Sequence, residues 1–105
     1  MQREYTRTGR TFTATVAASP AAATLVSSAR DGRVKIMLQN AGTGRVYYGF
    51  TSAVTPATGV IMHGGLGAGD GLGASREIAG YTGDVWMIGA AGGGDVDVRV
   101  EEVGE

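Results

Sequence analysis

The stretch at residues 33–50 reads RVKIMLQNAGTGRVYYGF, and the fold is best predicted from its pattern. Apolar side chains take every second position in residues 34–38 and again in residues 45–50. A two-residue period of this kind is typical of β-strands with one buried face. The residues between them, NAGTG at 40–44, have the length and composition of a hairpin loop. The two strands are therefore expected to pair directly as an antiparallel hairpin.

Similar short segments continue on both sides of this stretch. Near the C-terminus, the valines of VDVRV at 96–100 alternate with charged residues, which is typical of an edge strand. Turn residues separate the segments, and none of them shows the 3.6-residue apolar period of a helix. This pattern predicts an all-β fold, either an antiparallel β-sandwich or a small jelly-roll-like barrel. The expected strands cover residues 11–16, 24–26, 34–38, 45–50, 59–62, 75–78, 85–91 and 96–100.

The chain of 105 residues has the length of a single domain. Its first ten residues are polar and carry Arg3, Arg7 and Arg10, which predicts an extended N-terminal arm at 1–10. Residues 11–105 are expected to form one β-sandwich domain. Within that domain, the glycine-rich segment GGLGAGDGLG at 64–73 is expected to be a flexible surface loop.

The composition argues against several classes of function. A formal net charge of −1 lacks the basic excess that non-specific nucleic-acid binding needs. The absence of cysteine excludes disulfides and thiolate metal sites. No apolar stretch approaches the roughly 20 residues that span a bilayer, and the first residues are too polar for a signal peptide. We therefore expect synthesis in a cytoplasm and no membrane contact. Charged residues make up only 18 %, which suits a protein packed among other proteins.

No arrangement of residues indicates catalysis or metal binding. The glycine-rich segments lack the lysine of a phosphate loop and the spacing of a dinucleotide fingerprint. His63 is the only histidine and stands beside two glycines, so a hydrolase that uses it is only a third hypothesis. The aspartates and the pair Glu101-Glu102 lack the spacing of a calcium loop and are expected on solvated faces. The sequence therefore predicts no enzymatic activity, no cofactor and no bound metal.

Two of the expected strands are apolar on both faces. In residues 46–50, Tyr47 opposes the face of Val46, and in residues 85–88, Trp86 opposes the face of Val85. A chain of this size has one inner layer, so something else must cover part of these strands. A loop of the same chain or an interface with another protein would both explain the pattern. Tyr47 and Trp86 therefore join Arg3, Arg7 and Arg10 as candidate interface residues.

Two stretches resemble a known group of proteins. Residues 33–50 contain a hydrophobic strand that ends in Asn40, a turn with glycines, and Val-Tyr followed by Gly. In this they resemble small β-sandwich structural proteins of tailed bacteriophages. Residues 79–102, AGYTGDVWMIGAAGGGDVDVRVEE, are similar to the closing hairpin of the same proteins. Together the two stretches cover about 40 of the 105 residues.

The resemblance implies a non-enzymatic virion protein. Such proteins serve as head decoration (cement) proteins, which bind the major capsid protein, often as trimers with extended N-terminal arms. The implied location is the head surface of a virion assembled in the cytoplasm of a host bacterium. The alternative is a head-fibre, neck or tail accessory module that recognises a receptor or glycan. Residues 1–10 carry more positive than negative charge and residues 95–105 the reverse, which suggests head-to-tail contact between copies.

Overall fold

The computed structural model describes residues 8–104, and this part of the chain forms strands without any helix. Each of the eight segments expected from the alternation is a strand, so the all-β prediction is confirmed. The strands are β1 (Thr8–Val16), β2 (Thr24–Ser27), β3 (Arg33–Asn40), β4 (Val46–Gly49), β5 (Val60–Met62), β6 (Ser75–Ala79), β7 (Val85–Gly89) and β8 (Val96–Gly104).

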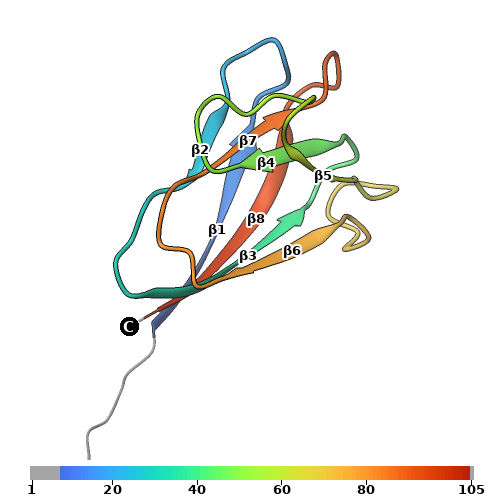
Figure 1. Cartoon of the computed structure of the whole chain (residues 1–105). Coiled ribbons are helices and arrows are strands. Elements are labelled where there is room, and N and C mark those ends of the chain that lie inside the picture. Colours follow the sequence, from blue (N-terminus) through green and yellow to red (C-terminus); the bar gives the residue numbers. More distant parts are fainter. Residues whose placement is uncertain (1–7, 105) are drawn as a thin grey trace, which may run out of the picture.

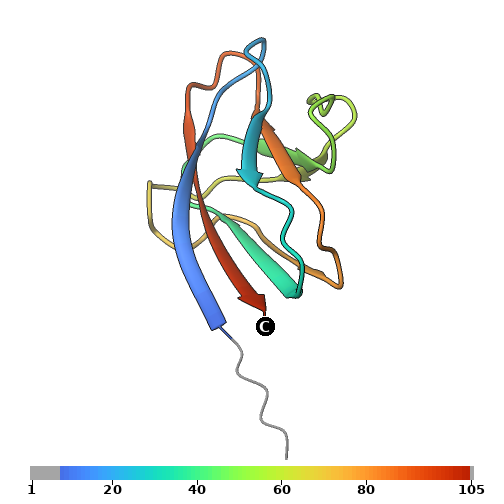
Figure 2. The same cartoon turned by 90° about the vertical axis from the view of Figure 1, so that its left-hand side faces the viewer.

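The strands form two antiparallel sheets of four strands that pack face to face (Figures 1 and 2). We call them sheet A, with the order β1-β8-β3-β6, and sheet B, with the order β2-β7-β4-β5. Strands from the two halves of the chain pair in reverse order, β1 with β8, β2 with β7, β3 with β6 and β4 with β5. The chain is thus one long hairpin wound around itself, which is the jelly-roll arrangement. The predicted β-sandwich is confirmed, with the strand order of a jelly roll.

The hairpin expected at residues 33–50 is wrong, because β3 and β4 lie in different sheets. Asn40 ends β3 and is 1 % exposed. Its side-chain amide donates to the carbonyl oxygens of Gly44 (2.8 Å) and Met62 (3.1 Å), and its side-chain oxygen accepts from the N–H of Gly42 (2.9 Å). These bonds tie the loop to the end of β5 in the opposite sheet. The loop therefore crosses from one sheet to the other instead of reversing the chain within one.

The closing hairpin at residues 79–102 is wrong for the same reason. β7 lies in sheet B, between β2 and β4, whereas β8 lies in sheet A. β8 is also not an edge strand, since it pairs with β1 on one side and β3 on the other. From Val96 to Glu101, its charged residues are exposed on the outer face while its valines are buried inside the sandwich. A central strand of a half-solvated antiparallel sheet has the same alternation as an edge strand.

The core lies between the two sheets and consists of their inward-facing aliphatic side chains. Ile36 and Leu38 of β3 and Met87 of β7 are fully buried there. Phe12, Tyr48 and other partly buried apolar side chains pack around this centre. The buried members of the cluster are Val16, Val26, Ile36, Leu38, Val46, Met62, Val85, Met87, Val96, Val98 and Val100.

The boundary expected between arm and domain at residue 10 is too late. β1 begins at Thr8, and its register pairs Thr8 with Gly104 and Arg10 with Glu102. The end of the predicted arm is therefore part of sheet A. The rest of the arm, residues 1–7 with Arg3 and Arg7, lies outside the described residues.

Candidate functional site

The glycine-rich segment 64–73 folds into a defined loop at one end of the sandwich, on the right in Figure 1. The Asp70 carboxylate accepts hydrogen bonds from the backbone N–H groups of Leu66 (2.9 Å), Gly67 (2.8 Å) and Leu72 (2.8 Å). These N–H groups, first those of Leu72 and Gly67, hold the pKa of Asp70 below its ordinary value because they stabilise the ionised form. The sequence predicted a flexible loop here, whereas the structure shows one organised around a carboxylate.

The same loop is attached to the β3–β4 connection. The N–H of Gly65 donates to the Gly42 carbonyl (2.9 Å), and that of Gly69 donates to the Ala41 carbonyl (2.7 Å). Gly73 passes so close to the carbonyl oxygen of Asn40 that a side chain there would collide with it. The loop after β3 and the loop after β5, which are more than 20 residues apart in the sequence, are therefore held against each other.

We expect Gly73→Ala to lower the free energy of unfolding by about 1–3 kcal/mol, because the added methyl group meets fixed backbone atoms. Gly67→Ala is the matched control, since a Cβ at that position meets nothing within 4 Å. Urea unfolding of both variants checks the prediction. Equal stability of the two variants would contradict the close approach of Gly73 to Asn40.

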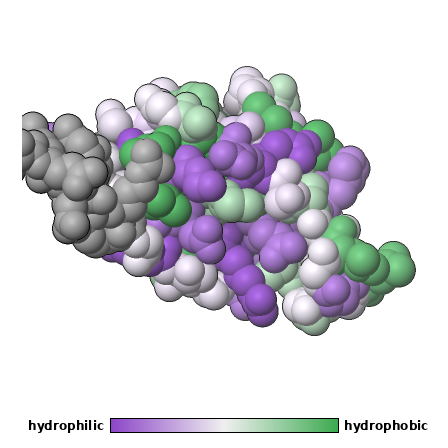
Figure 3. All heavy atoms as spheres, turned by 90° about the horizontal axis from the view of Figure 1, so that it is seen from below, coloured by the Kyte–Doolittle hydropathy of each residue, from purple (hydrophilic) through white to green (hydrophobic). Residues whose placement is uncertain are grey.

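The loop holds two leucines in solvent. Leu66 is 90 % exposed and Leu72 is 66 % exposed, the two highest values among the exposed large hydrophobic residues of the described chain. Phe50 and Val60, which are also exposed, belong to the same part of the sequence. Figure 3 shows hydrophobic atoms projecting at the right-hand end, the end where the loop lies in Figure 1. Leu66 and Leu72 extend from the same small loop around Asp70, and exposed apolar groups that lie together on the surface are typical of a protein-binding site.

This part of the chain is also almost free of charge. Between Arg45 and Arg76 the only aspartate, glutamate, lysine or arginine is Asp70, whose carboxylate is bonded to its own loop, and the only histidine is His63. We call residues 46–75 the low-charge segment. It contains β4, β5, the connection between them and the Asp70 loop. Depletion of charge is the compositional mark of the buried centre of an interface.

The candidate residues Tyr47 and Trp86 lie on the outer face of sheet B. Tyr47 is 9 % exposed and packs with Val54 and Ile88, so the β4–β5 loop covers it. A Cβ at Gly59 would touch both Tyr47 and Val54, which shows how closely the loop lies on the sheet. Of the two explanations for the apolar outer face, a loop of the same chain accounts for Tyr47. Trp86 is half-buried and pairs across the strands with Leu25, which is 41 % exposed.

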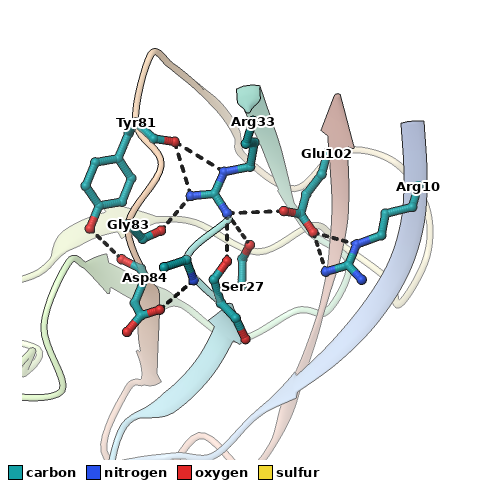
Figure 4. Close-up of polar contacts among 9 residues, drawn as sticks. Arg10, Ser27, Arg33, Tyr81, Gly83, Asp84 and Glu102 are labelled. Atoms are coloured by element: carbon teal, nitrogen blue, oxygen red, sulfur yellow. Dashed lines mark hydrogen bonds and ion pairs between the residues drawn. The ribbon is translucent and has the colours of Figure 1, made fainter. Parts of the chain in front are cut away.

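Arg10 has a partner within its own chain. Its Nε and Nη2 atoms lie 2.8 Å and 2.7 Å from Oε1 of Glu102, as Figure 4 shows. Its guanidinium also lies 4.9 Å from the centre of the Phe12 ring. The opposite charges of the two chain ends predict contact between copies. Arg10 and Glu102, however, form their ion pair within a single chain. The Arg10 side chain remains 58 % exposed.

The same carboxylate belongs to a buried network that the sequence did not predict (Figure 4). Nη1 of Arg33 lies 3.1 Å from Oε2 of Glu102, and both side chains are fully buried. Arg33 also donates to Ser27 Oγ and to the carbonyls of Ser28, Tyr81 and Gly83. Glu102 was expected to be solvated beside Glu101, and that prediction is wrong. The inward positions of Val96, Val98 and Val100 continue to residue 102, so the alternation itself indicated its burial.

Groups for catalysis or metal binding do not converge in the described residues. His63 is exposed at the start of the Asp70 loop. Residues 8–104 hold no group of three or more histidine, aspartate or glutamate side chains that could bind a metal ion. The same part of the chain has no helix that could cross a membrane. A shallow pocket of about 270 Å³ lies on the outer face of sheet A, lined by Thr11, Met37, Leu38, Gln39, Ser75, Arg99, Val100 and Glu101.

Fold and surface together define this chain as an eight-stranded jelly-roll domain with a low-charge segment that presents exposed hydrophobic residues. No protein-family model matches the chain, and no curated protein matches it either. The resemblance to structural proteins of tailed bacteriophages therefore depends on residues 33–50 and 79–102 alone.

Proposed function

We propose that this chain is a non-enzymatic structural protein of a tailed-phage particle, a decoration protein that binds the major capsid protein on the head surface. The β-sandwich agrees with the fold that the resemblance implies. The observation that carries the proposal is the pair Leu66 and Leu72, held outward by an ordered loop within the low-charge segment. Assembly onto heads in the host cytoplasm follows from the same proposal.

Leu66 and Leu72 would gain free energy if a binding partner removed them from water. Full burial of one exposed leucine side chain contributes about 1.5–3 kcal/mol. The hydrogen bonds of Asp70 already order the loop, so binding costs less conformational entropy than it would for a disordered segment. Within the low-charge segment Asp70 is the only aspartate, glutamate, lysine or arginine, and the Arg99 guanidinium lies beside Gly69 of the loop, so few charges have to be desolvated. An apolar pocket on a neighbouring protein subunit is the partner surface that fits these properties.

We expect the double variant Leu66→Ser/Leu72→Ser to bind phage heads at least about 100-fold more weakly than the unchanged chain, given the burial energy of two leucines. Co-sedimentation with expanded heads of the phage that encodes the chain measures this affinity. Leu25→Ser/Met37→Ser is the matched control, because those side chains are 41 % and 37 % exposed outside the low-charge segment. Leu66→Ser/Leu72→Ser should unfold at nearly the same urea concentration as the unchanged chain, because those side chains lie mostly in solvent. The control variant should lose some stability, because Leu25 and Met37 are more than half buried, so its binding is measured well below its unfolding temperature.

Quantifying the copies of the chain in purified particles separates the proposal from its alternative. Copies in the hundreds on heads, together with a raised melting temperature of those heads, would support decoration. A dozen copies or fewer would instead support a neck, vertex or tail accessory. Absence from particles, or equal binding by both double variants, would contradict the proposal.

One observation favours the alternative of a receptor- or glycan-binding module. The pocket on sheet A brings the hydroxyls of Thr11 and Ser75 and the charges of Arg99 and Glu101 to one shallow hollow. Its volume of about 270 Å³ lies just below the range of about 300–1,000 Å³ that is usual for small-ligand sites. Tyr81, an aromatic candidate for such a role, is used within the fold, since its ring stacks on Phe50 at 4.4 Å and its hydroxyl donates to Asp84. Glycan-array binding that Arg99→Ala abolishes would support this alternative.

A further inference from the structure

The two sheets have four edge strands, and three of them are protected against pairing with another chain. An exposed edge offers unpaired N–H and C=O groups, which proteins guard with charges, short strands or bulges. β6 carries Arg76 and Glu77. β5 has only three residues, and Nη2 of Arg76 donates to its Ile61 carbonyl (3.2 Å). β2 has four residues, and its register is shifted between Leu25 and Ser27.

β1 is the fourth edge, and its described residues have neither a short length nor a bulge and carry a single charge. It is nine residues long and pairs with β8 without a register shift (Figure 2, blue strand beside the red one). Its only charged residue is Arg10, whose guanidinium is turned to Glu102. Residues 11–29 contain no charged residue at all. Phe12 and Ala14 point into the sandwich from β1 but are only half-buried.

We propose that β1 is a self-association edge, at which β1 of a second copy adds in antiparallel orientation and joins two A sheets into one. The side chains of Thr11, Thr13 and Thr15 point outward along this strand. A two-fold axis at Thr13 places Thr11 opposite Thr15 of the other copy. The Thr15 hydroxyl donates to Asp97 of its own chain (2.9 Å), and its oxygen can still accept from Thr11 across the contact. A two-fold interface brings the same surface of both copies together, so that surface must be complementary to itself. The outer face of β1 meets this condition, because threonine meets threonine across the axis.

Charge favours the antiparallel orientation over the parallel one. About the axis at Thr13, Arg10 faces Val16 of the other copy, and the two Arg10 side chains lie at opposite ends of the contact. In a parallel pair in register, the two Arg10 side chains would lie side by side and repel each other. The added strand would also cover the exposed parts of Phe12 and Ala14.

This inference follows from the fold and does not depend on the proposed phage function. A two-fold contact produces dimers, whereas the resemblance to decoration proteins implies trimers. Measurements on the isolated chain, without phage heads, therefore test it separately from head binding.

The experiment is analytical ultracentrifugation of the full chain and of Thr13→Lys, Thr13→Asp and their equimolar mixture. We expect dimers of the unchanged chain and at least about a tenfold weaker dimer for Thr13→Lys, since like charges then meet at the axis. Thr13→Asp should weaken the dimer by a smaller factor, because residue 13 lies opposite Arg99 of its own chain, which offsets part of the added charge. The mixture should restore dimers, because lysine then faces aspartate. Thr82→Lys adds the same charge at an exposed loop position and should dimerise normally.

Several outcomes would overturn the proposal. These are a monomeric or trimeric unchanged chain, single variants that dimerise normally, or a mixture that stays monomeric while each variant remains folded by circular dichroism. Amide exchange at β1 that slows only when heads are added would assign the edge to a strand of the capsid protein instead of a second copy.

Discussion

Replacing Arg33 by methionine is expected to lower the free energy of unfolding by about 3–5 kcal/mol, because it leaves the Glu102 charge buried without its buried partner. The carbonyls of Tyr81 and Gly83 lose their donor at the same time. Domains of this size are stable by about 5–15 kcal/mol in total. The variant should therefore lose a large fraction of its stability.

Urea unfolding followed by the fluorescence of Trp86, the only tryptophan, measures this loss. With a typical denaturant dependence of about 1–3 kcal/mol per molar urea, the midpoint should fall by at least about 1 M. Arg99→Met is the matched control, because Arg99 lies exposed on the outer face of β8 and should change stability by less than about 0.5 kcal/mol.

A double variant tests whether the effect belongs to the charge pair. Arg33→Met/Glu102→Met removes both buried charges, and replacing a whole buried pair by apolar side chains is often neutral. We expect the double variant to be more stable than Arg33→Met alone. A double variant with the summed losses of the two single variants, or an Arg33→Met midpoint equal to that of Arg99→Met, would contradict the role of the network.

The positions and faces of the strands could be predicted from the sequence, but their partners could not. Whether a strand has a buried face is visible in its own two-residue period, as in residues 34–38. Which strands pair depends on contacts between distant segments. The loop at 40–44 has the composition of a hairpin, yet Asn40 uses its side chain to reach Met62 on the opposite sheet. Local turn chemistry alone does not distinguish these two arrangements.

At the candidate surface, too, the contacts between distant segments could not be predicted from the sequence. The glycine-rich segment looked flexible because its composition offers no core. Its order comes from the carboxylate of Asp70 and from the backbone hydrogen bonds of Gly65 and Gly69 to the β3–β4 connection. Gly69 and Gly71, on either side of Asp70, have φ angles of 72° and 78°, which suit glycine. Tyr47 was recognised as an apolar residue on a second face, but the loop that covers it could only be found in three dimensions. Arg33 and Glu102 are 69 residues apart, so their pairing had no local signal.

The free energy of unfolding is also expected to depend on pH through Glu102. Burial raises the pKa of this carboxyl group, but the hydrogen bonds from Arg10 and Arg33 and the charge of Arg10 outweigh burial and hold the pKa below its ordinary value of 4.5. A carboxyl group with a lower pKa in the folded state stabilises the fold fully at pH values above its unfolded pKa. That contribution declines as the pH falls below about 4.5 and is lost below the folded pKa.

We expect Glu102→Gln to be strongly destabilised at neutral pH, because Arg33 then keeps a buried charge without a full counter-charge. The difference in unfolding free energy from the unchanged chain should stay constant from neutral pH down to about pH 5.5 and shrink below about pH 4.5, by at most about 1.4 kcal/mol per pH unit. Urea unfolding at a series of pH values measures this difference.

Glu101→Gln serves as the control, because Glu101 is the adjacent residue on β8 and its side chain points to solvent on the other face. At neutral pH its stability should stay close to that of the unchanged chain, because the substituted side chain is exposed. Comparing each variant with the unchanged chain cancels the contribution of Asp70, which has the same sign and is present in all three proteins. A difference for Glu102→Gln that is independent of pH, or that grows as the solution becomes more acidic, would show that the ionised Glu102 does not stabilise the fold. The loss in Arg33→Met would then come from its hydrogen bonds to the backbone carbonyls, because those bonds do not change with the protonation of Glu102.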